Sequence, residues 1–407
     1  MGEAATDGSP ARMPTVPVIP GEPYDGPLAL ECAHFRRDEC RSCTLLPLEP
    51  DEQGSRAMRR LRGLLPDPGI EWSAPVRSAA GGFRTKAKMV VTGTSERPVL
   101  GLPGAPGTAP ADLRDCPLYP PELTAALEHV AWFITRAALP PYRVDRRRGE
   151  LKHVLLTLGR GEDSAGRLML RFVLRSEAAL PRIREHLPAL LERIPGLEVV
   201  SANLHPAHAA TLEGEREIVL TEAATLPVDL GGLTFHVRPR SFLQTNPAVA
   251  AELYRQGADW AGAAQSVWDL YCGVGPFGLH VARADPSREV VGVETSREAV
   301  DSARLTARSA GLRARFEVAD ATSWAIEQPA GPDLVIVNPP RRGIGTALAS
   351  WLDASSTGAV LYSSCNPASL ARDLARMPQL RPVRARLFEM FPHTAHSEVL
   401  VLLRRAA

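Results

Sequence analysis

The sequence predicts an α/β protein whose C-terminal part is a doubly wound, mostly parallel sheet that ends in an antiparallel hairpin. Three observations predict this fold class. Short apolar runs recur from about residue 237 onward, helical stretches separate the first five runs, and no helix separates the last two. The predicted strands are Val267–Leu270, Val290–Glu294, Ala314–Val318, Leu334–Val337, Ala359–Ser363, Ala385–Met390 and Val399–Leu403.

Three further segments precede this domain, which we expect to span residues 237–407. Residues 1–27 are rich in Pro, Gly and Ala and are expected to be a disordered tail. Residues 28–80 form a cysteine-rich segment, and residues 81–236 are expected to form an α+β unit. The elements predicted in this unit are strands over 83–91, 151–158, 167–174 and 197–203 and a helix over 177–193.

Composition sets broad limits on the kind of protein. The chain has 407 residues, a net charge of +1 and 44% hydrophobic residues, which is typical of a globular protein with two or three domains. No stretch reaches the apolar length of a membrane span, and the N-terminus lacks a signal-peptide pattern, so we expect a cytoplasmic monomer without an obligate protein partner. In that compartment, cysteines are expected to be metal ligands or catalytic groups rather than disulfides.

Cys365 follows an apolar run and directly precedes Asn366 and Pro367. The run predicts a buried parallel strand, and Pro367 suits the first turn of a following helix. Cys365 would then lie at the sheet edge where open α/β folds bind ligands. A helix N-terminus lowers the pKa of a thiol, so this placement predicts an activated nucleophile. The alternative is a small buried core residue.

A glycine-rich turn follows the first strand of this sheet. Gly273, Gly275 and Gly278 match the pattern G-x-G-x-x-G, in which glycines let a ligand approach the backbone closely. Glu294 ends the second strand, where a carboxylate can accept hydrogen bonds from ribose hydroxyls. Cys272 within the turn is expected to be a packing residue. These features fit NAD and S-adenosylmethionine equally well.

The motif Asn338-Pro339-Pro340, after the fourth predicted strand, favours S-adenosylmethionine. Its prolines hold a loop at the edge of the sheet, and this loop type is typical of methyltransferases that act on flat nitrogenous groups. In enzymes that methylate amino groups an aromatic residue follows the prolines. Arg341 follows here, which argues against an exocyclic amine as the target. The alternative is a proline-rich turn without a role.

Four cysteines outside the doubly wound domain form a candidate metal site. They are Cys32, Cys40, Cys43 and Cys116. Zinc and iron–sulfur clusters both accept four thiolates, so the spacing leaves the choice between them open. The alternative is a set of buried cysteines that bind no metal.

Taken together, these motifs resemble the RNA uracil-C5 methyltransferase family. The chain is most similar to the bacterial 23S rRNA branch, whose iron–sulfur cysteines lie near the N-terminus, although the long tail before Cys32 departs from it. The matching motifs follow the family order and cover nearly all of residues 32–407. They are Gln244-Thr245-Asn246-Pro247, Asp269 through Gly278, Asn338 through Gly343, Ser363 through Pro367, and Phe391 through Glu398.

The resemblance implies a Rossmann-like class I methyltransferase domain that methylates C5 of a uridine in 23S rRNA. It implies that Cys365 is the nucleophile, that Glu398 is the base, and that a [4Fe–4S] cluster rather than zinc binds the four cysteines. The central α+β unit would bind RNA. The residues expected to bind S-adenosylmethionine are Gln244, Tyr271, Gly273, Glu294 and Asn338.

The chemistry of uracil supports these roles independently. C5 is too weakly nucleophilic to accept a methyl group unaided, and addition of a thiolate at C6 makes it nucleophilic. A base must then remove the C5 proton before the thiol can leave. The target base must also be flipped out of the folded RNA. The alternatives are a tRNA uracil-C5 methyltransferase, an amino-methyltransferase and an RNA-binding module without catalysis.

Overall fold

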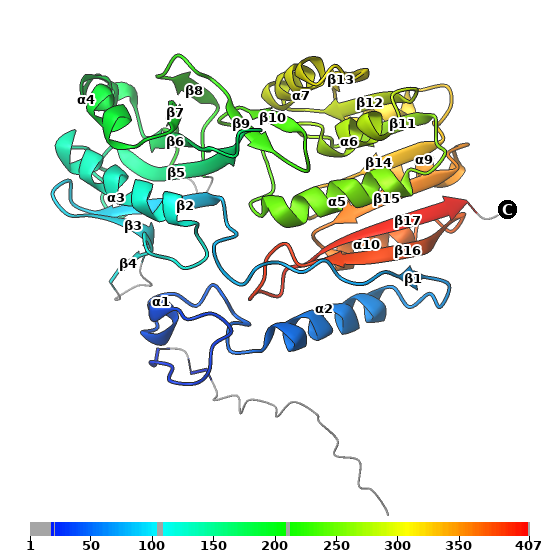
Figure 1. Cartoon of the computed structure of the whole chain (residues 1–407), viewed down its shortest axis with the longest axis horizontal. Coiled ribbons are helices and arrows are strands. Elements are labelled where there is room, and N and C mark those ends of the chain that lie inside the picture. Colours follow the sequence, from blue (N-terminus) through cyan, green and yellow to red (C-terminus); the bar gives the residue numbers. More distant parts are fainter. Residues whose placement is uncertain (1–17, 20, 104–108, 209–211, 406–407) are drawn as a thin grey trace, which may run out of the picture.

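The computed structural model contains two large sheets with helices around them (Figure 1). It describes residues 18–19, 21–103, 109–208 and 212–405. The expected disordered tail, residues 1–27, therefore lies mostly outside the described residues. In the part of the chain that is described, no helix is long and apolar enough to cross a membrane.

The C-terminal sheet has eight strands in the order β1-β16-β17-β15-β14-β11-β12-β13. Strands β11 to β15 all run parallel to one another, and β17 is antiparallel to both β15 and β16. The seven predicted strands and the final hairpin are thus confirmed. The strands are β1 (Glu71–Trp72), β11 (Ser266–Leu270), β12 (Glu289–Glu294), β13 (Ala314–Val318), β14 (Leu334–Val337), β15 (Ala359–Ser364), β16 (Leu380–Phe388) and β17 (Glu398–Arg405).

Helices cover both faces of this sheet and enclose an apolar core on each side. Proline at the first turn begins several of them, because its fixed φ suits that position and its missing N–H would have no helical partner there. They are α5 (Pro247–Trp260), α6 (Pro276–Ala284), α7 (Arg297–Ser309), α8 (Ala321–Ile326), α9 (Gly345–Ala354) and α10 (Pro367–Leu374).

Part of the cysteine-rich segment packs against this C-terminal sheet. Strand β1 adds to the sheet edge parallel to β16. Helix α2 (Pro50–Leu64) follows the short helix α1 (Ala33–Arg36), and its Leu61 lies in the same core as Leu65 and Ile70. The sequence did not predict this packing, because a strand of two residues has no periodicity and its partner lies at the other end of the chain.

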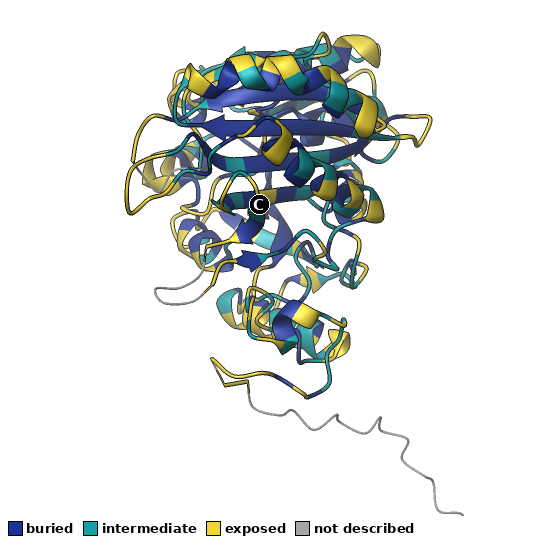
Figure 2. Cartoon of the chain, turned by 90° about the vertical axis from the view of Figure 1, so that its left-hand side faces the viewer, coloured by how far each residue is buried: buried dark blue, intermediate teal, exposed yellow. Residues whose placement is uncertain are grey.

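The central unit is a seven-stranded sheet in the order β4-β3-β2-β5-β6-β7-β8, with helices α3 and α4 packed on one face. Figure 2 shows its strands largely buried while the outer surfaces of the helices are exposed. The predicted strands and helix of this unit are confirmed. Its elements are β2 (Lys86–Gly93), β3 (Pro98–Leu102), β4 (Ala111–Asp112), α3 (Pro121–Arg136), β5 (Leu151–Arg160), β6 (Gly166–Leu174), the 3₁₀ turn Glu177–Ala179, α4 (Leu180–Arg193), β7 (Leu197–Leu204) and β8 (Arg216–Val219).

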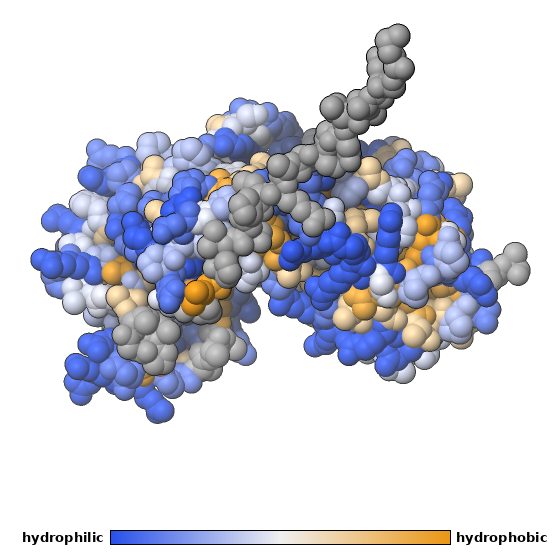
Figure 3. All heavy atoms as spheres, turned by 90° about the horizontal axis from the view of Figure 1, so that it is seen from below, coloured by the Kyte–Doolittle hydropathy of each residue, from blue (hydrophilic) through white to orange (hydrophobic). Residues whose placement is uncertain are grey.

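A two-stranded ribbon connects the central unit to the C-terminal sheet. It consists of β9 (Leu226–Asp229) and β10 (Thr234–Val237). Its buried Phe235 lies in the core of the C-terminal half, although the sequence places this residue in the central unit. Seen from below, the surface is hollowed between the two halves of the molecule (Figure 3).

Candidate active site

Cys365 lies directly after β15, at the carboxyl end of the parallel strands and one residue before the N-cap of α10. The Asn366 side chain accepts a hydrogen bond from the backbone N–H of Ala368, which satisfies one of the free donors at the start of the helix. The same side chain donates to the carbonyl oxygen of Arg341 at 2.8 Å. The nucleophile loop is therefore tied to the Pro-Pro-Arg loop, as the sequence alone could not show.

Burial raises the pKa of the half-buried Cys365 thiol, and the charge of Glu398 acts in the same direction. The guanidinium of Arg341 opposes both effects. In the protein alone the net shift is therefore opposite to the lowering expected from the start of α10, because loss of solvation is the largest effect on this thiol.

Glu398 is the first residue of β17 and is almost completely buried. Strands β15 and β17 are antiparallel with Ser364 opposite Val399, so Glu398 and Cys365 follow this pair at the same edge of the sheet. The hydroxyl of Ser363 donates to Glu398 Oε1 at 2.5 Å. Burial nevertheless raises the pKa of Glu398 to about 7, which suits a general base near neutral pH.

The glycine-rich turn brings together three of the predicted cofactor residues. Tyr271 and Gly273 both have positive φ, and Gly273 N–H donates to Glu294 Oε2 at 3.2 Å. A side chain at Gly275 would approach Phe316 to 2.6 Å, so only glycine fits there. The turn therefore presents open backbone next to a carboxylate at the carboxyl ends of β11 and β12.

Buried Asp269 stabilises this turn through a hydrogen bond to the backbone. Its Oδ2 accepts a hydrogen bond from Gly278 N–H at 2.8 Å, and burial raises its pKa to about 7. Cys272 is buried in the core of the C-terminal half, which confirms the expectation that it is a packing residue. Asp269 belongs to a motif recognised in the sequence, but its contact with Gly278 was not predicted.

The two remaining predicted cofactor residues lie on other segments. Asn338 follows β14 and its N–H donates to the carbonyl oxygen of Leu270, which places it beside the glycine-rich turn. Gln244 is buried on the segment between β10 and α5, and the next residue, Thr245, accepts hydrogen bonds from Thr85 in the central unit. Gln244 thus lies where the two halves of the molecule meet.

The four cysteines of the candidate metal site, Cys32, Cys40, Cys43 and Cys116, line one small cavity of about 30 Å³. Burial raises the pKa of the Cys43 thiol to about 12 and that of Cys116 to about 11, and the charges of other thiols in the set add to both effects. Among the residues that the structure describes, no three His, Cys, Asp or Glu side chains are placed to hold a single metal ion.

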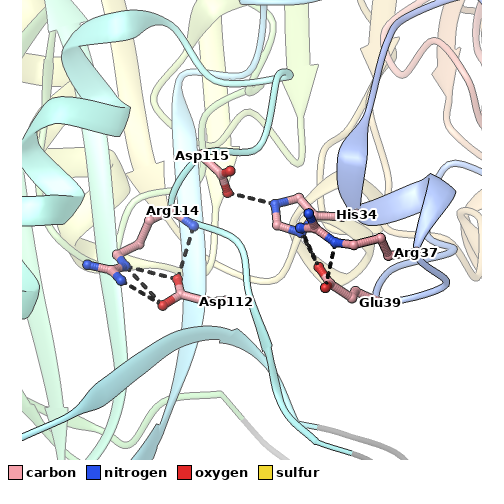
Figure 4. Close-up of polar contacts among 6 residues, drawn as sticks. All are labelled: His34, Arg37, Glu39, Asp112, Arg114 and Asp115. Carbon is pink, nitrogen blue, oxygen red and sulfur yellow. Dashed lines mark hydrogen bonds and ion pairs between the residues drawn. The ribbon is translucent and has the colours of Figure 1, made fainter.

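His34 joins the two parts of the chain that carry these cysteines (Figure 4). Its Nε2 lies 2.6 Å from Asp115 Oδ1, beside Cys116, and its Nδ1 lies 2.7 Å from Glu39 Oε2, beside Cys40. The sequence offered no signal for this bridge, because His34 and Asp115 are far apart along the chain.

Comparison with known proteins identifies the family. The family model for tRNA (uracil-5-)-methyltransferase matches residues 327–406, and the model for the methyltransferase small domain matches residues 233–351. A 23S rRNA (uracil(747)-C(5))-methyltransferase of Pectobacterium carotovorum is 47% identical over 92% of this chain and 100% of the relative. The corresponding protein of Shewanella amazonensis is 48% identical over 93% of this chain and 98% of its own length.

This chain belongs to the RNA uracil-C5 methyltransferase family. A solved structure of the tRNA (uracil-54, C5)-methyltransferase of Pyrococcus abyssi, in complex with S-adenosyl-L-homocysteine, has the same fold. Its TM-score is 0.74 at 24% identity, over 90% of this chain and 86% of that one. The α/β methyltransferase fold expected from the sequence is thus confirmed.

Proposed function

We propose that this protein uses S-adenosylmethionine to methylate C5 of a uridine in 23S rRNA, at the position corresponding to uracil 747. The observation that carries this proposal is the placement of Cys365 and Glu398 at one edge of the sheet, in a chain 47% identical over 92% of its length to a 23S rRNA (uracil(747)-C(5))-methyltransferase. A thiol and a buried carboxyl with a pKa of about 7 are the two groups that the reaction requires.

The proposed reaction has four steps. The Cys365 thiolate adds to C6 of the flipped uracil, and the resulting enolate makes C5 nucleophilic. C5 takes the methyl group from S-adenosylmethionine, which leaves as S-adenosylhomocysteine. Glu398 then removes the proton from C5. The electron pair of that C–H bond forms the C5=C6 double bond, the bond from C6 to sulfur breaks, and Cys365 leaves as a thiolate.

The cofactor would lie across the carboxyl ends of β11, β12 and β14. The turn at Gly273 and Gly275 would let it approach the backbone, and the carboxylate of Glu294 would accept hydrogen bonds from ribose hydroxyls. Tyr271 begins this turn, and Asn338 bonds the carbonyl oxygen of Leu270 just before it. Gln244 would contact the cofactor from the segment that borders the central unit.

We further propose that the four cysteines bind a [4Fe–4S] cluster. All four line one cavity, and a cubane cluster accepts four thiolate ligands. Thiols with raised pKa values bind metal only after they lose their protons. The reaction transfers no electrons, so the cluster would have a structural role and would tie residues 28–80 to the central unit.

The central unit would bind RNA through the face of its sheet that α3 and α4 leave uncovered. Lys86 and Lys88 lie on this face, because the intervening Ala87 points into the core beneath the helices. In the described residues neither lysine forms an ion pair with a carboxylate. Lys88 is exposed, whereas burial lowers the pKa of Lys86 to about 8. A cation on this face, beside the cofactor segment, suits contacts to phosphates.

Mapping of 5-methyluridine in 23S rRNA and tRNA from a strain without this protein tests the proposed function. We expect the loss of one 5-methyluridine in 23S rRNA and its return when the wild-type gene is restored. A loss confined to tRNA would favour the tRNA alternative. Unchanged methylation in both RNAs would favour an RNA-binding module and would refute the proposal.

A further inference from the structure

His393 lies in the loop that leads from β16 to Glu398 at the start of β17. Its side chain is buried, and its backbone has a φ of +66°, in the left-handed region that residues other than glycine rarely adopt. Such a conformation is strained and persists only where surrounding contacts enforce it.

Each polar group of His393 forms a hydrogen bond with one part of the chain, residues 45–80. Its N–H donates to Gln53 Oε1 at 2.8 Å, and its carbonyl oxygen accepts from Leu45 N–H at 2.8 Å. Its Nε2 lies 2.7 Å from the carbonyl oxygen of Ala80, so Nε2 must carry the proton. The other ring nitrogen, Nδ1, then accepts from the Gln53 side chain at 3.3 Å.

Two of these partners lead directly to the proposed cluster. Leu45 is two residues after Cys43. Ala80 is two residues before Gly82, whose N–H donates to the carbonyl oxygen of Pro117, the residue after Cys116. The loop that carries Glu398 is thus anchored to Leu45, close to Cys43, and to the segment of Ala80, which is hydrogen-bonded to the residue after Cys116.

We propose that His393 is a positioning residue through which the cysteine-rich segment holds Glu398 in place for removal of the C5 proton. This inference rests on the proposed function. A shifted Glu398 slows the last chemical step, in which the proton leaves C5 and the bond between C6 and Cys365 breaks. Thiolate addition and methyl transfer precede that step and do not use Glu398. The methylated covalent complex of protein and RNA therefore accumulates when the anchor is lost.

The test compares His393→Ala and His393→Gln with the wild-type protein. Methyl transfer is followed in a single turnover with labelled S-adenosylmethionine, and the covalent complex is measured on denaturing gels. In His393→Ala we expect nearly unchanged methyl transfer but release of RNA slowed roughly tenfold, part of the 10²–10⁴ that a positioned base contributes. His393→Gln retains an amide donor toward Ala80 and should recover most of the release rate.

Gln53→Ala provides a second variant. It removes two of the four hydrogen bonds of His393 by changing the partner residue, so the sequence of the loop that carries Glu398 stays unchanged. It should also accumulate the covalent complex. The matched control is His280→Ala, which removes another buried histidine whose ring contacts two carbonyl oxygens, those of Pro276 and Leu230, at 2.7 and 2.9 Å. The control should lower stability without changing the ratio of release to methyl transfer.

Equal slowing of every step in His393→Ala and Gln53→Ala would overturn the inference, as would equal accumulation of the covalent complex in His280→Ala. Failure of the proposed function gives a different result. In that case the wild-type protein itself would neither methylate the RNA nor form a covalent complex with RNA that contains 5-fluorouridine.

Discussion

Cys365 and Glu398 act on each other before any substrate is bound. The charge of Glu398 raises the pKa of the thiol, so the site favours one negative charge at a time. Arg341 lowers the thiol pKa and is held beside it by the hydrogen bond from Asn366 to its carbonyl oxygen. At the scale of single residues, the motifs identified both reactive groups. They could not reveal Ser363 and His393 as supports, because these contacts depend on tertiary structure.

Replacement of the proposed nucleophile, Cys365→Ala, should abolish methylation, because C5 of uracil then stays too weakly nucleophilic. Binding of S-adenosylmethionine, measured by calorimetry, should stay within about twofold of wild type, since the thiol is not among the proposed cofactor contacts. The variant should also form no covalent complex with 5-fluorouridine RNA, which the wild-type protein should trap. Turnover near the wild-type rate would exclude the covalent mechanism.

Replacement of the proposed base, Glu398→Gln, should permit one methyl transfer and then stall. The amide cannot accept the C5 proton, so the bond between C6 and sulfur persists. A burst of about one methyl group per protein, together with a covalent complex on denaturing gels, is the expected result. Release of methylated RNA at the wild-type rate would show that another group is the base.

Glu398 should also make stability depend on pH. Its folded-state pKa of about 7 lies above the usual 4.5, so the folded protein keeps a proton that the unfolded chain releases, and stability falls as pH rises through this window. Glu398→Gln should remove this loss, which is on the order of 3 kcal/mol at pH 8. Urea unfolding of both proteins at pH 5 and pH 8 measures it. An equal difference at both pH values would contradict the prediction.

At the scale of elements, the apolar pattern of the sequence predicted the strands that alternate with helices in the C-terminal sheet. The prediction failed for segments that are very short or whose apolar residues are interrupted by charged residues. Strand β16 begins at Leu380, earlier than predicted. The prediction missed its first residues because Arg381 and Pro382 interrupt the apolar pattern, and Pro382 lies beside a register shift. Strand β1 has only two residues. Helix α2 was not predicted to join the C-terminal core, since its partners are distant in sequence.

The open face of the central sheet should contribute to RNA binding through Lys88, which is exposed near the end of β2 that meets the cofactor segment. Lys88→Ala should weaken RNA binding and reduce the slope of log affinity against log salt by about one. Arg193→Ala, on the helix α4 that covers the opposite face, is the matched control and should leave the slope unchanged. An equal effect of both variants would place the RNA elsewhere.

At the scale of the whole molecule, the cysteine cavity connects the central unit with the segment that reaches the catalytic sheet. Anaerobically purified protein should be brown and contain about four irons and four sulfides per chain. Cys40→Ser should lose the colour and lower the yield of folded protein and its RNA affinity more than its affinity for S-adenosylmethionine. Colourless wild-type protein with one zinc would refute the iron–sulfur assignment.

The pairing of β1 with β16 also bears on the order in which the fold can form during translation. Strand β1 leaves the ribosome early, but its partner is made only after most of the chain, and Glu398 follows later still. The residues of β1 therefore stay without their partner strand through most of the synthesis, and helix α2 cannot complete its contacts with the C-terminal core until that core is made. Glu398 is also made after Cys365, so the proposed nucleophile and base come together only once β17 has paired with β15.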